Sequence, residues 1–232
     1  MPPADTTLVL SCEHGGNMIP ARYRPLFKGA ATVLRSHRGW DPGSLELART
    51  IRRATRAPLI ATTTSRLLVE CNRSIGHPRL FSEFTRSLDE RDKAQLLKTY
   101  YHPHRDAVER AIHDRMRTVH RVVHIGVHTF TPVYEGRRRT VDIGVLHDPR
   151  RAFESGVACA LVGALKTATP GLKVYRNLPY RGWSDGLTTS LRETFPASRY
   201  AGIELEVSQR FVGTARWRAL QRSIASAIRA QG

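Results

Sequence analysis

Cysteine is scarce in this sequence of 232 residues. Its three cysteines, Cys12, Cys71 and Cys159, are odd in number and far apart, which excludes a disulfide framework and zinc-finger spacing. Long apolar runs are also missing, since no stretch approaches the roughly 18 to 20 residues that a membrane-spanning helix needs. A secretory signal requires a basic segment before its apolar run, and no such segment precedes the run at 7–12. We therefore expect a cytoplasmic protein that does not associate with membranes.

Several catalytic signatures are absent as well. The sequence has no phosphate-binding loop, no dinucleotide-binding glycine pattern and no His-Glu-x-x-His motif. These absences disfavour nucleotide-dependent enzymes and the common metalloproteases. Cys12 lies two residues before His14, and residues two apart on a strand share a face without necessarily touching. A cysteine hydrolase that uses Cys12 is kept as an alternative.

Acidic residues are few, since 20 Asp and Glu against 37 Lys and Arg give a formal net charge of +17. The basic residues are scattered, apart from short clusters at 52–53, 137–139 and 150–151. A basic field attracts nucleic acid or small anionic substrates. The sequence has no aromatic RNA-binding motif, helix-turn-helix signature or basic tail, so we expect no specific nucleic-acid partner. A non-enzymatic basic nucleic-acid-binding protein is kept as an alternative.

What is present is an alternation of short apolar strands and amphipathic helices, which is typical of a mostly parallel sheet covered by helices. No repeat, low-complexity segment or linker divides the chain, so we predict one α/β domain over residues 1–232. Its sheet is expected to be mixed, mostly parallel and flanked by helices. The predicted strands are 7–12, 58–63, 65–72, 122–130, 140–148, 172–177 and 201–207.

Helix signals separate these strands. Asp41 and Pro42 suit the cap and first position of a helix. The stretch 88–119 is predicted to be helical with an interruption near Pro103. Further helices are predicted after Asp148-Pro149 and at the end of the chain.

Polar residues follow the first and third predicted strands. The first runs into Glu13-His14, and the third runs into Asn72-Arg73. In open α/β sheets, ligands bind at the carboxyl edge of the strands. We therefore expect these side chains to lie at a binding site.

Two later strands carry polar residues within them. His124 and His128 lie four residues apart on the strand at 122–130, and hence on one face. Glu204 and Glu206 likewise share one face of the last strand, while aliphatic residues occupy the other.

Each of these residues also has a purely structural explanation. A loop histidine can bond to backbone, His124 can be a hydrogen-bonded core residue, Arg73 can pair with Glu70, and Glu204 and Glu206 can form a solvated face. Together, however, the histidines, the carboxylate and the Asn-Arg pair predict a hydrolytic zinc centre. Zinc binds imidazole and carboxylate ligands with one position open for water, a nearby glutamate can take a proton, and an arginine fork suits a substrate carboxylate.

Seven short motifs carry a resemblance to a known family. They are "SCEHGGNMIP", "HRGWDPG", "RLLVECNR", "HIGVHTFTP", "RRRTVDIGVLHD", "NLPYRGWSDG" and "GIELEVSQRF". In this order, from about residue 7 to residue 212, the sequence resembles the N-formylglutamate amidohydrolase family. That family is related in fold to zinc carboxypeptidases and aspartoacylases, so the resemblance implies a zinc-carboxypeptidase-like fold with the metal at the carboxyl edge of the sheet. It also implies hydrolysis of an N-formyl or N-acyl amino acid.

The resemblance also implies roles for individual residues. His14 and His128 match the family's metal-binding histidines, and the metal would be Zn²⁺ or another divalent ion. Asn72 and Arg73 resemble the pair that grips the substrate α-carboxylate. Glu206 resembles the strand glutamate that acts as general base.

The third metal ligand is left open by a departure from the related pattern. The carboxypeptidase-type motif is His-x-x-Glu, but the fourth position here is Asn17. Asp41 is the first choice, followed by Glu13 and Asn17. Glu70 stands where related acylases have aspartate and is expected to support Arg73.

The expected reaction is amide hydrolysis of a small anionic N-acyl amino acid, with N-formylglutamate as the first candidate. A second anion site could come from Arg138, Arg139 or Arg181, and Tyr180 is expected to line the pocket. Another zinc hydrolase of the carboxypeptidase or acylase type would share the site and differ in substrate.

Overall fold

The structure is a computed structural model that describes residues 5–230. Its main sheet has six strands in the order β2-β1-β3-β8-β6-β7. The strands are β1 (Thr6–Cys12), β2 (Leu59–Ala61), β3 (Arg121–Phe130), β6 (Ile143–Leu146), β7 (Val174–Arg176) and β8 (Tyr200–Ser208). All neighbouring strands pair in parallel except β6 and β8. The predicted α/β fold with a mixed, mostly parallel sheet is confirmed.

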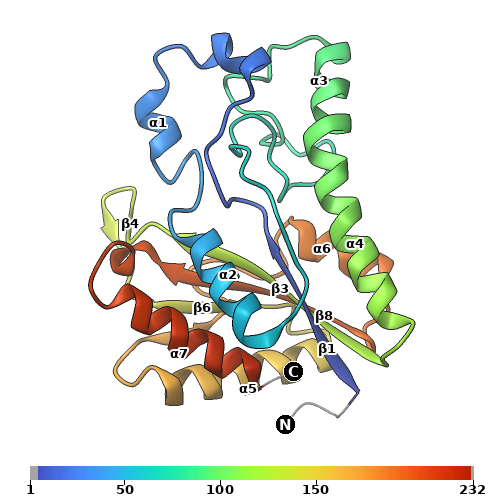
Figure 1. Cartoon of the computed structure of the whole chain (residues 1–232), viewed down its shortest axis with the longest axis vertical. Coiled ribbons are helices and arrows are strands. Elements are labelled where there is room, and N and C mark those ends of the chain that lie inside the picture. Colours follow the sequence, from blue (N-terminus) through green and yellow to red (C-terminus); the bar gives the residue numbers. More distant parts are fainter. Residues whose placement is uncertain (1–4, 231–232) are drawn as a thin grey trace.

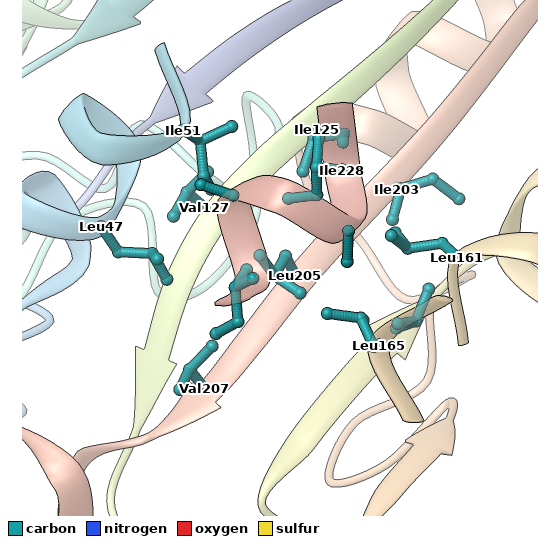
Figure 2. Packing of buried hydrophobic residues seen from close by; sticks show 14 of the residues in the cluster. Leu47, Ile51, Ile125, Val127, Leu161, Leu165, Ile203, Leu205, Val207 and Ile228 are labelled. Carbon is teal, nitrogen blue, oxygen red and sulfur yellow. The ribbon is translucent and has the colours of Figure 1, made fainter. Parts of the chain in front are cut away.

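One face of the sheet packs on three helices, α2 (Ser44–Thr55), α5 (Ala152–Ala168) and α7 (Trp217–Arg229). Figure 1 shows these helices together on one side of the strands. The core between them is aliphatic, with leucines and isoleucines of the helices meeting Ile125, Val127, Ile203, Leu205 and Val207 of β3 and β8 (Figure 2). These strand residues alternate in sequence, so the residues between them point to the other face.

The other face packs on α4 (His102–Met116) and α6 (Leu187–Thr194). Because β1, β3 and β8 alternate, Glu13, His124, His128, Glu204 and Glu206 all belong to this face. The predicted polar residues of three strands are thereby directed to one side of the sheet.

A further section of the chain lies beyond the carboxyl ends of β1 and β3, at the top of Figure 1. It contains the 3₁₀ segment η1 (Ala21–Phe27), α1 (Ala31–Arg35), α3 (Glu90–Leu96) and the π-helical turn η2 (Leu97–Tyr101). It has its own apolar cluster, which includes Tyr23, Phe27, Leu68 and Leu96. The predicted helix runs without a break from Glu90 to Met116, and in place of the interruption predicted near Pro103 the structure has the π-helical turn η2 directly before α4.

Two short strands and one short helix complete the fold. They are the hairpin β4 (Val133–Tyr134) and β5 (Arg137–Arg138), which follows β3, and the 3₁₀ turn η3 (Gln209–Phe211), which follows β8. Within residues 5–230, no helix is both long enough and apolar enough to cross a membrane.

The strand predicted at 65–72 is wrong. This stretch forms turns, in which Leu68 N donates to Ser65 O and Arg73 N donates to Glu70 O, and Glu70 N donates to the backbone oxygen of the more distant Leu80. Its apolar residues are nevertheless buried, because they pack into the section beyond the sheet. A short apolar run indicates burial without specifying the backbone conformation.

The helix start predicted at Asp41 is also wrong. The helix begins at Ser44, with Gly43 as its cap in a left-handed conformation (φ 85°). Ser44 N donates to the backbone oxygen of Asp41. The Asp41 side chain therefore does not cap the helix and is used elsewhere.

Candidate active site

Three buried side chains from distant parts of the chain meet beyond the carboxyl end of the sheet. His14 follows β1, Asp41 precedes α2, and His128 lies near the end of β3. The ring atom Nδ1 of His14 is 3.1 Å from Asp41 Oδ2 and 3.2 Å from His128 Nδ1, and the distance from His128 Nδ1 to Asp41 Oδ2 is 3.1 Å. These three atoms form a nearly equilateral triangle.

The opposite ring nitrogens face two further carboxylates. Nε2 of His14 lies 2.5 Å from Glu70 Oε1, and Nε2 of His128 lies 3.0 Å from Glu13 Oε2. At His14 the carboxylate beside Nε2 favours the tautomer that carries its proton there, which leaves Nδ1 as an acceptor, whereas within the described residues Nε2 of His128 has only the 3.0 Å ion-pair contact with Glu13. Two imidazole nitrogens and one carboxylate oxygen thus converge on the same point. A buried group of this kind could hold a metal ion.

The carboxylates around the two histidines raise the pKa values of both rings. Burial alone lowers the pKa of His128, but the carboxylates of Asp41 and Glu13 raise it well above its usual value. Burial and Arg66 lower the pKa of His14, and Glu70 and Asp41 overcome both to raise it. The carboxylates around the site therefore favour a positive charge on both histidines.

The half-buried Arg66 and the buried His104 hold these carboxylates in place. Arg66 donates from Nε to Glu70 Oε2 at 2.6 Å, and its Nη1 lies 3.4 Å from Asp41 Oδ1. Nε2 of His104, on α4, lies 3.2 Å from Glu13 Oε1. Partners of this kind orient the ligands of a metal site.

Sequence reasoning missed Arg66 and His104. Arg66 precedes Glu70 by four residues inside the wrongly predicted strand. Residues at this spacing on a strand are not neighbours, so the sequence pattern did not indicate an ion pair. His104 follows Pro103 on a helix far from β1 in sequence, and the sequence gives no signal for its partner.

Glu206 lies beside the three converging side chains. It faces His128 across β8 and β3 in register. Burial raises the pKa of Glu206 to about 8, and the carboxylates of Asp41 and Glu204 add to this effect although His128 opposes it. Within the described residues, its buried Oε2 has no hydrogen-bond partner. An unpartnered carboxylate oxygen at this place is suited to accept a proton.

A cavity of about 690 Å³ opens over these groups. Its lining includes His14, Asp41, Asn72, Arg73, His128, Tyr180, Arg181 and Glu206. The structure therefore brings most of the predicted site residues to one cavity, and of the three arginines proposed for a second anion site only Arg181 lines it. Arg138 lies exposed on β5 and is not among the residues that line it.

Asn72 and Arg73 have different surroundings in the cavity. Asn72 is buried, accepts a hydrogen bond from Leu187 N at 2.7 Å, and donates weakly to Glu204 at 3.4 Å. Arg73 donates from Nη1 to the backbone oxygens of Asn72 and Asp185, at 2.9 and 2.6 Å. One nitrogen thus fixes the guanidinium, which leaves Nη2 and Nε for a ligand. Glu70 contacts Arg66 and His14, so the expectation that it supports Arg73 is replaced by a role at His14.

Tyr180 is positioned by Arg139 from behind. Arg139 donates to the Tyr180 hydroxyl at 2.8 Å, and its guanidinium lies 4.7 to 5.6 Å from the ring centres of Tyr180, Tyr134 and Phe130. Arg139 is therefore a support for the cavity, while Arg181 lines it directly.

Two glycines, one on β6 and one in the loop that bears Tyr180, allow this loop to pack closely against the end of β6. A Cβ at Gly144 would meet the backbone oxygen of Leu178 at 1.9 Å, and a Cβ at Gly182 would meet the backbone nitrogen of His147 at 2.0 Å. The side chain of Asn177 ties the loop further by accepting from His147 N and Gly182 N. These contacts bring the loop next to Glu206, whose Cβ lies 3.4 Å from the same point over Gly144.

Two alternatives from the sequence lie away from the converging acceptors. The side chain of Asn17 donates to the backbone oxygen of Leu34. Cys12 belongs to the aliphatic core on the other face of the sheet, and burial raises the pKa of its thiol to about 12. A buried thiol of this kind is a poor nucleophile.

The model of one family, N-formylglutamate amidohydrolase, matches residues 6–212 of the sequence. The chain belongs to this family. It is therefore an enzyme of the amidohydrolase type, as the seven motifs predicted.

Solved structures agree with this membership. The gene product Atu2144 from Agrobacterium tumefaciens is 31% identical, with a TM-score of 0.81 over 99% of this chain and 89% of that one. An N-formylglutamate amidohydrolase from Ralstonia eutropha JMP134 has a TM-score of 0.73 at 17% identity, over 99% of this chain and 94% of that one, and shares the fold. Among curated proteins, none matches this sequence closely enough to count as a relative.

Proposed function

We propose that this amidohydrolase uses a divalent metal ion, with zinc as the first candidate, to hydrolyse an N-formyl or N-acyl amino acid. N-formylglutamate is the first candidate substrate. The observation that carries the proposal is the convergence of three side-chain atoms that can bind a metal ion, His14 Nδ1, His128 Nδ1 and Asp41 Oδ2, on one buried point.

The donor set fits zinc in type and spacing. Ligands at about 2.0 Å from a tetrahedral zinc ion lie about 3.3 Å apart. The three edges of the triangle are 3.1, 3.2 and 3.1 Å. Two histidines and one carboxylate also match the ligands of known catalytic zinc sites, which leave a fourth position open. A bound ion would polarise the amide carbonyl and lower the pKa of an adjacent water.

The chain itself would hold the substrate and move the proton. Glu206 would accept a proton from the attacking water at Oε2 and return it to the leaving nitrogen. Arg73 would bind the α-carboxylate through its two free donor nitrogens, since a fork of this kind suits a carboxylate. Arg66 would keep Glu70 and Asp41 ionised and in place, because its positive charge lies beside both.

The proposal is tested by metal analysis of the purified protein together with measurement of formate release from N-formylglutamate. We expect about one equivalent of zinc per chain. Glu206→Gln is expected to keep the metal and lower kcat by roughly 10²- to 10⁴-fold, as for loss of a general base.

The matched control is Glu204→Gln, which changes the same charge two residues earlier on the same strand face. Its carboxylate already accepts from Asn72 and Thr188, so we expect a smaller loss of kcat than in Glu206→Gln. Absence of bound metal after incubation with zinc, or unchanged turnover in Glu206→Gln, would overturn the proposed mechanism.

A further inference from the structure

The cavity has two chemically different sides. Its buried side is rich in carboxylates, since Asp41, Glu70, Glu204 and Glu206 all line it. Its exposed residues include Arg79, Arg86 and Arg181, which we call the outer arginines, together with the Arg38–Glu83 ion pair, and the half-buried Asp185 also lines the cavity. Because like charges repel, a second acid group of a substrate is disfavoured on the carboxylate side and favoured at the outer arginines.

The outer arginines are available for a ligand. Within residues 5–230 none of them forms an ion pair, whereas the neighbouring Arg38 is paired with Glu83. Arg181 lies with its guanidinium 5.8 Å from the ring centre of Trp183, a contact that leaves its donors free. Three unpaired positive charges therefore face one cavity.

Arg79 and Arg86 belong to a loop with firm anchors. The backbone oxygen of Leu80 accepts from Glu70 N, and Leu80 is buried beside Val69. Thr85, next to Arg86, is buried as well. Since Glu70 also contacts His14, this loop is held at a fixed place relative to the proposed metal site.

The size of the cavity exceeds the need of the first candidate substrate. At about 690 Å³ it falls among pockets of roughly 300 to 1,000 Å³ that hold drug-sized ligands. N-formylglutamate is smaller than such ligands. If its α-carboxylate binds at Arg73, a cavity of this volume has room for a longer substrate.

We propose that the outer arginines bind a second acid group that lies beyond the reach of a glutamate side chain. This inference rests on the proposed function and specifies its substrate class: N-acyl amino acids extended by a further acidic residue. The representative compound is N-formyl-γ-glutamylglutamate.

The test compares two product-like probes by calorimetry with the zinc-loaded protein. γ-Glutamylglutamate carries one more carboxylate than glutamate, and we expect it to bind at least about tenfold more tightly because guanidinium–carboxylate contacts are charge-assisted. The double variant Arg79→Ser/Arg86→Ser is expected to lose most of this difference while its affinity for glutamate changes little.

The control is Arg218→Ser/Arg222→Ser on α7, which removes the same charge from exposed positions outside the cavity. It separates a local contact from the general attraction of a basic protein. Equal affinities for the two probes, no binding of γ-glutamylglutamate, or an equal loss in both double variants would overturn the inference.

Hydrolysis of the two formylated compounds is measured in parallel. If neither is hydrolysed but γ-glutamylglutamate binds preferentially through the outer arginines, the anion site stands and the proposed reaction fails. If both are hydrolysed with the same kcat/KM, the reaction stands and the inference fails.

Discussion

The middle of β3 and its carboxyl end each hold a buried histidine on the same face of the sheet, in opposite surroundings. His124 lies between hydroxyl groups, with Nδ1 2.9 Å from Tyr200 Oη and Nε2 2.8 Å from Ser11 Oγ. His128 lies between the carboxylates of Asp41 and Glu13. Burial lowers the pKa of His124 to about 4, whereas the carboxylates raise that of His128 well above its usual value.

The change from hydroxyl to carboxylate occurs on the neighbouring strand. Ser11 and Glu13 are two residues apart in sequence and face His124 and His128 in turn. The strand pattern thus determines that both histidines are buried on one face. Their neighbours determine which one stays neutral in the core and which one can serve a metal ion.

The largest expected effect separates the two histidines by metal content. His128→Ala removes one of three acceptors, and we expect bound zinc to fall from about one equivalent to none. His124→Gln should keep the metal, because His124 contacts only hydroxyl groups. Metal analysis after dialysis measures both, and circular dichroism checks folding. Equal metal contents in the two variants would contradict the comparison.

A smaller effect concerns stability in acid. The pKa of His124 is about 4 in the folded protein and 6.5 in the unfolded chain, so the unfolded chain binds the proton first as the pH falls. The stability from a neutral His124 is complete above pH 6.5 and is lost towards pH 4, by about 3 kcal/mol.

The measurement is urea unfolding at several pH values across this window, in the wild type and in His124→Gln. The loss of stability from neutral pH to pH 4 should be smaller in the variant, since carboxylates titrate in both proteins. Parallel curves for the two proteins would show that His124 is not protonated on unfolding.

The smallest expected effects come from the partners on and directly after β1. Glu13→Gln weakens the support behind His128, and we expect zinc affinity to fall about 10- to 100-fold, as for other groups that orient metal ligands. Ser11→Ala leaves His124 Nε2 without a partner and should cost about 1 to 3 kcal/mol of stability. Competition with a chelator and urea unfolding distinguish the two. A change of zinc affinity in Ser11→Ala would contradict the assignment of Ser11 to His124 and of Glu13 to His128.

Much of this arrangement could be predicted from the sequence. Strand periodicity placed His124 and His128 on one face, and strand ends indicated the edge where His14 lies. The motifs indicated the family and suggested Glu206 as a candidate general base. These signals are local, because strand patterns and motifs consist of residues that are close in sequence.

The remaining parts depend on contacts between distant residues. Asp41 was the first choice from the sequence for the place beside the histidines, but the reason given, a helix start at Asp41, was wrong, and its position rests on the path of the chain before α2. The roles of Arg66 and Glu70 were hidden because residues 65–72 form turns instead of a strand. Whether Arg138 or Arg139 supports the cavity depended on the short hairpin after β3.

The bare backbone at Gly144 bears on the engineering of this enzyme. Because the Leu178 carbonyl rests where a side chain would be, the sheet itself sets the height of the loop that carries Tyr180 and Arg181. The tip of this loop can then vary in sequence without losing its place, while position 144 cannot. A library aimed at new acyl amino acids should therefore diversify residues 180 and 181 and leave the glycine beneath them unchanged.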